Sequence, residues 1–276
     1  TLWGLNPLGH HLTNNILHAF NTLLVVILAI RLVELFKASK KSISSTDLSS
    51  RGRKTLLIGA TTGLLFGIHP LHVESVAWVS ERKDLLCALF FLLSILFYLQ
   101  YIRDKKPDQS KLSARFLDKW YLYAFGFFSL AVLSKSMAVT LPLVLIIIDW
   151  YPAERIQSLR TFKNVLMEKL PFFFLSLFSS VITILAQRSG RAIVPLEDTS
   201  LAVRFILGAN ALVSYLLKIV LPVDLLPFYP YPKDVSLMSF KYGVMVLVVI
   251  GISAACIAAA RKHKILAGVW LYYVIS

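Results

Sequence analysis

Five of the six histidines lie in two short segments of the sequence, 10–18 and 69–72, with asparagines in the first segment and a carboxylate, Glu74, just after the second. In the first segment a polar series runs His11, Asn14, His18 and Asn21. This spacing places the four side chains on one face of an otherwise apolar helix. Polar side chains in such a helix either hydrogen-bond to a neighbouring helix or line a water-filled cavity. Both interpretations stay open, and the residues that would line the cavity are His11, Asn14, His18 and His69.

The second segment, 69–84, reads HPLHVESVAWVSERKD. Pro70 suits the first turn of a helix, and Glu74, Trp78, Glu81 and Arg82 follow at a spacing that would place them on one helix face. The alternative is a solvated loop in which the tryptophan anchors the membrane interface. Two histidines and a glutamate at HxxHxE spacing could hold a metal ion, but no fourth ligand is visible. We therefore predict no metal site and no cofactor, with a divalent metal as the less favoured alternative.

The composition indicates the environment of the whole chain. Of the 276 residues 57% are hydrophobic and 16% are charged, whereas soluble domains average about 25% charged residues. This composition excludes a soluble globular domain and a disordered chain, and it indicates a protein embedded in the lipid bilayer.

The net charge of +14 has an explanation in membrane topology. Most of the 29 lysines and arginines lie in four short hydrophilic loops, at 37–54, 103–119, 155–169 and 261–264. Loops enriched in these residues stay on the cytoplasmic side. The charge therefore does not indicate a nucleic-acid partner, and the histidine segments are predicted to lie at the opposite, non-cytoplasmic side.

Apolar runs between these loops predict an all-α polytopic membrane protein with about eight spans of the roughly 20 residues that a bilayer requires. Residues 187–241 are predicted to form a non-cytoplasmic loop. Within it, 205–221 is predicted to be an interfacial or re-entrant helix, because charged and amide side chains interrupt it. We expect residues 1–276 to form a single transmembrane domain that is truncated at both ends. The predicted spans are 11–36, 55–68, 85–102, 120–133, 137–150, 171–186, 242–260 and 265–276.

A few cations lie on the predicted non-cytoplasmic side, against the usual charge bias: Arg82, Lys83, Lys135, Arg188 and Arg191. Ordinary interfacial snorkelling is one explanation. Cations beside histidines at the membrane boundary also suit a lipid-linked phosphate or diphosphate, which arginine binds with two hydrogen bonds and lysine as a point charge. The candidate phosphate contacts are Arg82, Lys83 and Lys135, followed by His72 and Arg188.

Several segments together resemble a known family. Residues 9–18 (GHHLTNNILH), 69–78 (HPLHVESVAW), 81–84 (ERKD), 134–142 (SKSMAVTLP) and 168–172 (EKLPF) resemble the membrane half of the TMTC-like transmembrane O-mannosyltransferases. The resemblance is greatest to their prokaryotic relatives, which carry tetratricopeptide repeats behind the membrane domain. One departure is Lys135-Ser136, where the family typically carries Lys-Pro.

The resemblance implies a GT-C-like transmembrane helix bundle. Such an enzyme transfers a sugar, a hexose such as mannose, from a polyprenyl- or dolichyl-phosphate donor to serine or threonine hydroxyls of a protein acceptor on the non-cytoplasmic side. It also implies a catalytic carboxylate in the first non-cytoplasmic loop, which we expect upstream of Thr1, and C-terminal repeats that are absent here. Within this sequence the substitute candidates are Glu74, Glu81 and Asp84.

The predicted location is a prokaryotic cytoplasmic membrane, or the endoplasmic reticulum membrane in a eukaryote. Two other functions stay open. One is a transporter or flippase for a lipid-linked solute, although transporters need charges or broken helices near the midplane, and here the unusual charges lie at one face. The other is a non-catalytic membrane anchor for a repeat scaffold.

Overall fold

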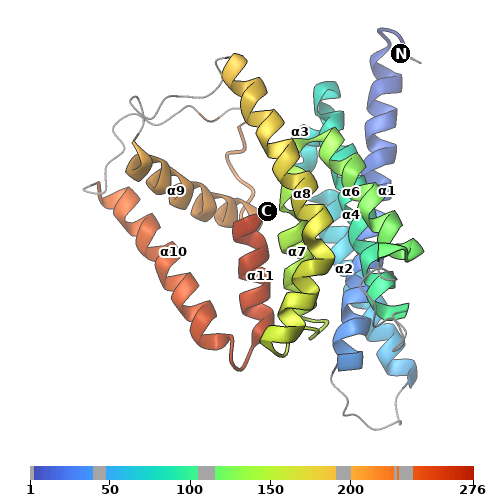
Figure 1. The fold of residues 1–276 in the computed structure, drawn as a ribbon. Helices are drawn as coiled ribbons and strands as arrows, with labels where there is room; N and C mark the ends of the chain where they lie inside the picture. The colour runs from blue at the N-terminus through green and yellow to red at the C-terminus, as the bar shows by residue number, and fades with distance from the viewer. Residues whose placement is uncertain (1–2, 40–47, 105–115, 191–199, 227–228, 230–238) are drawn as a thin grey trace. The chain divides into compact units, whose positions relative to one another are not determined.

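A computed structural model describes residues 3–39, 48–104, 116–190, 200–226, 229 and 239–276. These residues form helices, turns and irregular segments and contain no strand, so the all-α prediction is confirmed. The chain divides into two compact units, Thr1–Val181 and Ile182–Ser276 (Figure 1), and each is described by itself. The single transmembrane domain stays a prediction.

The first unit begins with an antiparallel helix pair, α1 (Pro7–Ser39) and α2 (Leu48–Ile68). Three glycines at four-residue intervals, Gly59, Gly63 and Gly67, let the two backbones approach closely. A Cβ atom at Gly63 would lie 2.3 Å from Val26 Cγ2, and one at Gly59 would lie 2.9 Å from Ile30 Cγ1. Small residues at such spacing allow helices in a membrane to pack by van der Waals contact.

After α2 the chain forms three short helices, where the spacing of Glu74, Trp78, Glu81 and Arg82 favoured one continuous helix face. These are η1 (Pro70–His72), α3 (Val73–Ala77) and η2 (Val79–Glu81). The prediction of one continuous face was wrong because Trp78 is extended, with ψ at 126°. Pro70 does occupy the first helical turn, as predicted, and His69 caps that turn by accepting a hydrogen bond from the Leu71 backbone N–H.

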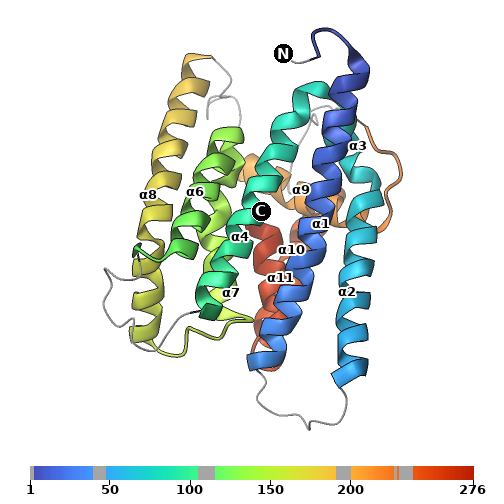
Figure 2. The same cartoon turned by 90° about the vertical axis from the view of Figure 1, so that its right-hand side faces the viewer.

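The main core lies among four helices of the first unit. They are α4 (Arg82–Asp104), α6 (Lys119–Ser134), α7 (Leu141–Trp150) and α8 (Leu159–Ser189), with η3 (Ser136–Thr140) before α7. Buried aromatic and aliphatic side chains fill the space between them, among them Tyr98, Phe128, Leu145 and Phe172. Figure 2 shows that the start of α1, α3 and the start of α4 lie at one end of this unit.

The second unit contains the end of α8 and three further helices, α9 (Leu201–Val220), α10 (Phe240–Ala259) and α11 (Lys264–Ile275). The Tyr273 hydroxyl of α11 donates a hydrogen bond to the Leu212 carbonyl of α9. By length and composition α9 could also cross a membrane. The interfacial placement predicted for 205–221 therefore stays a prediction.

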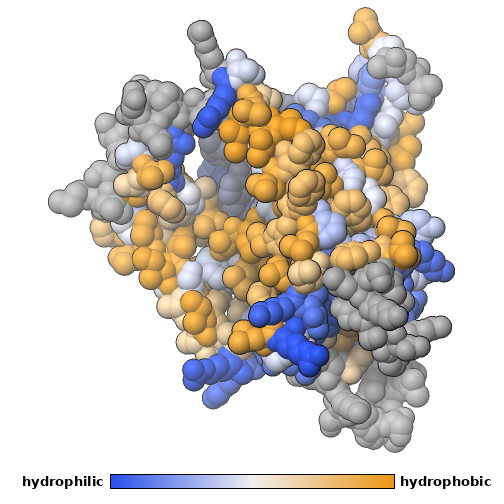
Figure 3. All heavy atoms as spheres, viewed as in Figure 1, coloured by the Kyte–Doolittle hydropathy of each residue, from blue (hydrophilic) through white to orange (hydrophobic). Residues whose placement is uncertain are grey.

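Five helical segments of the described residues are long and apolar enough to cross a membrane, and a sixth is gained if α2 and its bent continuation form one span. Apolar side chains cover the middle of α8, with hydrophilic ones gathered near its ends (Figure 3). The protein is therefore an integral membrane protein. The segments Ser136–Trp150 and Lys264–Ile275 are shorter than about 20 residues, so the predicted total of about eight spans stays a prediction.

Candidate functional site

Arg82 is held in a fixed orientation at the start of α4. Its Nε donates to Asn14 Oδ1 over 2.9 Å, and its Nη2 lies 3.1 Å from His10 Nδ1 and 3.2 Å from the His10 carbonyl oxygen. His10 and Asn14 are four residues apart on α1 and so share one face. Among the described residues no hydrogen bond or ion pair involves the other terminal nitrogen, Nη1. We call His10, Asn14 and Arg82 the Arg82 site.

Asn14 also fixes the turn that carries Arg82. Its side-chain amide donates to the carbonyl oxygens of Val76 and Trp78, at 3.0 and 3.1 Å. Val76 is the fourth residue of α3, and Trp78 is the break before η2. The buried Asn14 therefore satisfies backbone carbonyls that the broken helix would leave without partners, and its oxygen orients the guanidinium at the same time.

The rest of the polar series on α1 works in a similar way. His18 Nε2 lies 2.9 Å from the Gly67 carbonyl oxygen, and the buried Asn21 donates to the Leu85 carbonyl oxygen over 2.9 Å. These contacts favour hydrogen bonding between helices over cavity lining for Asn14, His18 and Asn21. His11 is exposed, and it is the adjacent His10, which the candidate set omitted, that contacts Arg82.

Three imidazoles gather beside the Arg82 site. The ring centroids of His18 and His72 are 5.5 Å apart, those of His69 and His72 are 6.3 Å apart, and Phe66 packs against His72 at 4.3 Å. Burial, and then the neighbouring His18 and His69, lower the pKa of His72 to about 4. His72 is therefore neutral near pH 7 and adds no positive charge for a phosphate. No group of three or more potential metal ligands is present within the described segments.

The remaining cations of this region are ion-paired. Lys135, between α6 and η3, lies 2.7 Å from the Asp84 carboxylate in the first turn of α4. Lys83 lies 3.5 Å from Glu81 and is half exposed. The structure thus brings Arg82, Lys83 and Lys135 to the start of α4, as the phosphate hypothesis requires, with two of the three already neutralised by a carboxylate. Glu74 is exposed on α3.

Two other cations of the phosphate hypothesis are not placed in this region. Arg188 lies near the end of α8, in the second unit, and is described only within that unit. Arg191 lies outside the described residues.

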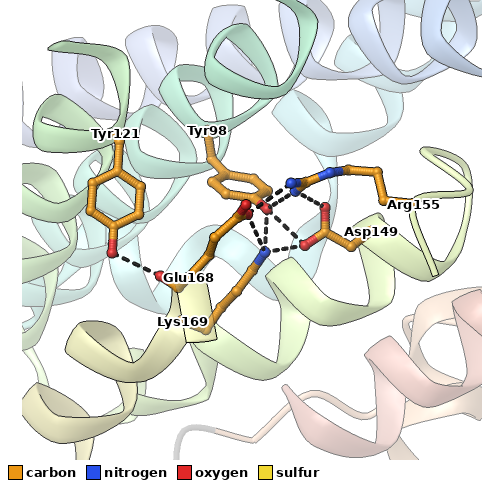
Figure 4. A network of polar contacts seen from close by, with 6 residues as sticks. All are labelled: Tyr98, Tyr121, Asp149, Arg155, Glu168 and Lys169. Carbon is orange, nitrogen blue, oxygen red and sulfur yellow. Dashed lines mark hydrogen bonds and ion pairs between the residues drawn. The ribbon is translucent and has the colours of Figure 1, made fainter. Parts of the chain in front are cut away.

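A second polar cluster, which the sequence interpretation missed, is buried in the first unit (Figure 4). Arg155 Nη1 lies 2.7 Å from Asp149 Oδ1, and Arg155 Nη2 lies 2.7 Å from Glu168 Oε2. Lys169 pairs with Asp149 Oδ2, and the Tyr98 hydroxyl donates to the same oxygen over 2.7 Å. We call these five residues the buried network. It joins α4, α7 and α8 to the connection between α7 and α8.

The buried network corrects one prediction. Arg155 and Lys169 were assigned to a short hydrophilic loop, whereas Lys169 is fully buried and the Arg155 side chain is only 17% exposed. The sequence contained a signal, since Asp149 ends an apolar run and Glu168-Lys169 immediately precedes another. Charged residues at such positions face the interior of a helix bundle and pair with one another.

Comparison with known proteins places these residues in context. Over 137 residues, half of this chain, the sequence is 32% identical to the mouse protein O-mannosyl-transferase TMTC4. It is 31% identical over 138 residues to human TMTC3, and 30% identical over 173 residues, 63% of this chain, to the Xenopus laevis tmtc2.

The matched part is a small fraction of these relatives, namely 17% of TMTC4, 12% of TMTC3 and 18% of tmtc2. No family model matches the chain. No solved structure matches it. The resemblance seen in the sequence motifs is confirmed: over half or more of its length, this chain is homologous to the TMTC protein O-mannosyltransferases.

Proposed function

We propose that the protein is a GT-C-type glycosyltransferase that moves a hexose such as mannose from a polyprenyl-phosphate donor to serine or threonine hydroxyls of a protein. The reaction would take place on the non-cytoplasmic side of a prokaryotic cytoplasmic membrane or of the endoplasmic reticulum membrane. The homologous proteins are named protein O-mannosyl-transferases, which supports the transfer of mannose to protein.

The observation that carries the proposal is the orientation of Arg82. Two groups of α1 hold one edge of its guanidinium, and Nη1 has no partner in the described part of the chain. Attack of a hydroxyl on the anomeric carbon breaks the bond to the lipid phosphate, which departs with increased negative charge. A pre-oriented cation next to the departing phosphate oxygen stabilises the transition state more than a mobile cation would.

The geometry ranks the other phosphate candidates below Arg82. Lys135 and Lys83 are engaged by Asp84 and Glu81, so each would have to leave a carboxylate to contact the donor. We propose Arg82 as the direct contact of the donor phosphate. His72, being neutral, would line the site without adding charge.

The reaction also needs a base to accept the proton of the attacking hydroxyl. The resemblance predicts a carboxylate of the first non-cytoplasmic loop for this role, and we keep that prediction. Of the three substitute carboxylates, Asp84 and Glu81 are ion-paired. Glu74 has no ion-pair partner within the described ranges, so it is the preferred substitute.

A transporter of a lipid-linked solute is the second candidate, because the buried network places charges inside the bundle, contrary to the earlier expectation. The charges of that network pair with one another: two cations face two carboxylates. A solute would have to displace these pairs, so the transferase is favoured. A non-catalytic anchor would need none of the contacts of the Arg82 site.

The test is transfer of labelled mannose from synthetic polyprenyl-phosphate mannose to an acceptor peptide by the full-length protein in vesicles. Wild-type protein should transfer mannose only to peptide on the face opposite the basic loops, and Arg82→Ala should lose at least about tenfold in rate. The matched control is Arg103→Ala, at the other end of the same helix. Donor movement without transfer would favour the transporter, and neither activity would favour the anchor.

A further inference from the structure

The protonation state of His10 is fixed by its two neighbours. Its Nε2 lies 3.0 Å from the Gly4 carbonyl oxygen, which can only accept a hydrogen bond. Its Nδ1 lies 3.1 Å from Arg82 Nη2, which can only donate. The imidazole can satisfy both contacts in one form alone, the neutral ring with its hydrogen on Nε2.

A second proton on the ring would remove the contact with Arg82. That proton would sit on Nδ1, where it would face the N–H groups of the guanidinium, and two positive charges would then lie about 3 Å apart. Arg82 would keep its contacts with Asn14 and the His10 carbonyl. These contacts would not hold Nη2 in its present position against the repulsion.

The turn before α1 provides the carbonyl oxygen of Gly4 that contacts His10 Nε2. Gly4 has φ at +53°, a conformation that glycine adopts at low cost. Its carbonyl oxygen reaches His10 as part of a turn closed by the Asn6 N–H and the Trp3 carbonyl. The Trp3 indole N–H donates to Thr13 Oγ1 over 3.1 Å, which ties the turn to the second turn of α1.

Other charged groups near the Arg82 site are engaged elsewhere. Glu81 of η2 pairs with Lys83, and Asp84 of α4 pairs with Lys135. Within the described ranges, Arg82 is the one charged side chain in hydrogen-bond contact with His10. A change in the charge of His10 therefore acts on Arg82 directly.

We propose that His10, by accepting a hydrogen bond from Arg82, is the positioning residue that aims the guanidinium at the donor phosphate. The inference deepens the proposed function and rests on it for the identity of the ligand.

Two substitutions separate the roles of the ring nitrogens. In His10→Asn the side-chain oxygen takes a position similar to that of Nδ1, so it can still accept a hydrogen bond from Arg82. In His10→Gln the amide reaches the position of Nε2 and can contact Gly4 while the acceptor for Arg82 is lost. His263→Asn, at an exposed histidine of the second unit, is the matched control.

The first readout is mannose transfer by the full-length protein at pH 7.5. We expect His10→Gln to lose about 10- to 100-fold at pH 7.5, because a misplaced catalytic group costs that much. His10→Asn should keep most of the rate, and His10→Gln should add little to the loss caused by Arg82→Ala. Wild-type rates in both His10 variants would overturn the inference.

The second readout needs no substrate. Phenylglyoxal modifies accessible arginines, and mass spectrometry gives the rate at Arg82 at fixed pH. We expect faster modification in His10→Gln than in the wild type, His10→Asn or His263→Asn, and equal rates in all four would overturn the inference. A wild-type protein without transfer activity but with this pattern would contradict the proposed function and leave the positioning role of His10 supported.

Discussion

Replacement of Lys169 by methionine should strongly destabilise the protein, because Lys169 balances the charge of the buried network. That network contains two cations, Arg155 and Lys169, and two carboxylates, Asp149 and Glu168. Lys169→Met conserves most of the side-chain volume but leaves a net buried negative charge. Removal of one partner from a buried ion pair costs about 3–5 kcal/mol, and we expect the free energy of unfolding to fall by that amount.

The double variant Lys169→Met with Asp149→Asn separates charge imbalance from lost packing. It removes one charge of each sign, so that Arg155 still pairs with Glu168 at 2.7 Å. We therefore expect the double variant to be more stable than the sum of the single variants predicts, by about 0.5–3 kcal/mol, the range found for residues in contact.

The assay is equilibrium unfolding of the full-length protein in mixed micelles, followed by tryptophan fluorescence. Lys163→Met, at an exposed lysine of the same helix, is the control and should change the free energy by less than about 0.5 kcal/mol. Equal effects of Lys163→Met and Lys169→Met, or additive effects of the Lys169 and Asp149 substitutions, would refute the reasoning.

Two further predictions concern the other parts of the first unit. Gly63→Ala should lower the free energy of unfolding by about 1–3 kcal/mol, because its Cβ would meet Val26 at 2.3 Å. The control Gly52→Ala, with open space around the glycine, should be neutral or stabilising. Equal effects of the two substitutions in the same unfolding assay would contradict the close packing of α1 and α2. The pKa of His72 is lowered to about 4 in the folded state. As the pH falls, His72 in the unfolded state therefore takes up its proton at a higher pH than in the folded state. The folded state should lose stability as the pH falls from about 6.5 to 4. His72→Gln should reduce this loss in thermal unfolding, and an unchanged pH dependence would show that His72 does not cause it.

The sequence predicted those parts of the fold that depend on composition and periodicity. Apolar runs separated by basic loops gave the long helices, because lipid leaves the backbone few other ways to satisfy its hydrogen bonds. The His11–Asn21 series indicated a polar face on α1, but it could not show that Asn14, His18 and Asn21 would contact backbone carbonyls. Those partners lie 49 to 64 residues away and depend on tertiary packing.

The errors arose where tertiary contacts overrode local preference. Helical spacing from Glu74 to Arg82 predicted one helix face, yet the chain breaks at Trp78, whose carbonyl oxygen accepts a hydrogen bond from Asn14. Basic residues predicted a hydrophilic loop at 155–169, yet Arg155 returns to the bundle to pair with Asp149 and Glu168. In both cases the deciding partner is remote or on another element, so spacing within one segment carries no information about it.

Equilibrium binding of a polyprenyl phosphate without sugar tests the central claim most directly. The full-length protein would be titrated in nanodiscs, with wild type, Arg82→Ala and Arg103→Ala compared at pH 7.5 and the folding of each verified by its unfolding transition. A charge-assisted contact contributes about 1.5–3 kcal/mol, so Arg82→Ala should weaken binding about 10- to 100-fold while Arg103→Ala leaves it within about twofold. Equal affinity in all three proteins, or equal loss in the two variants, would contradict the assignment of Arg82 as the phosphate contact.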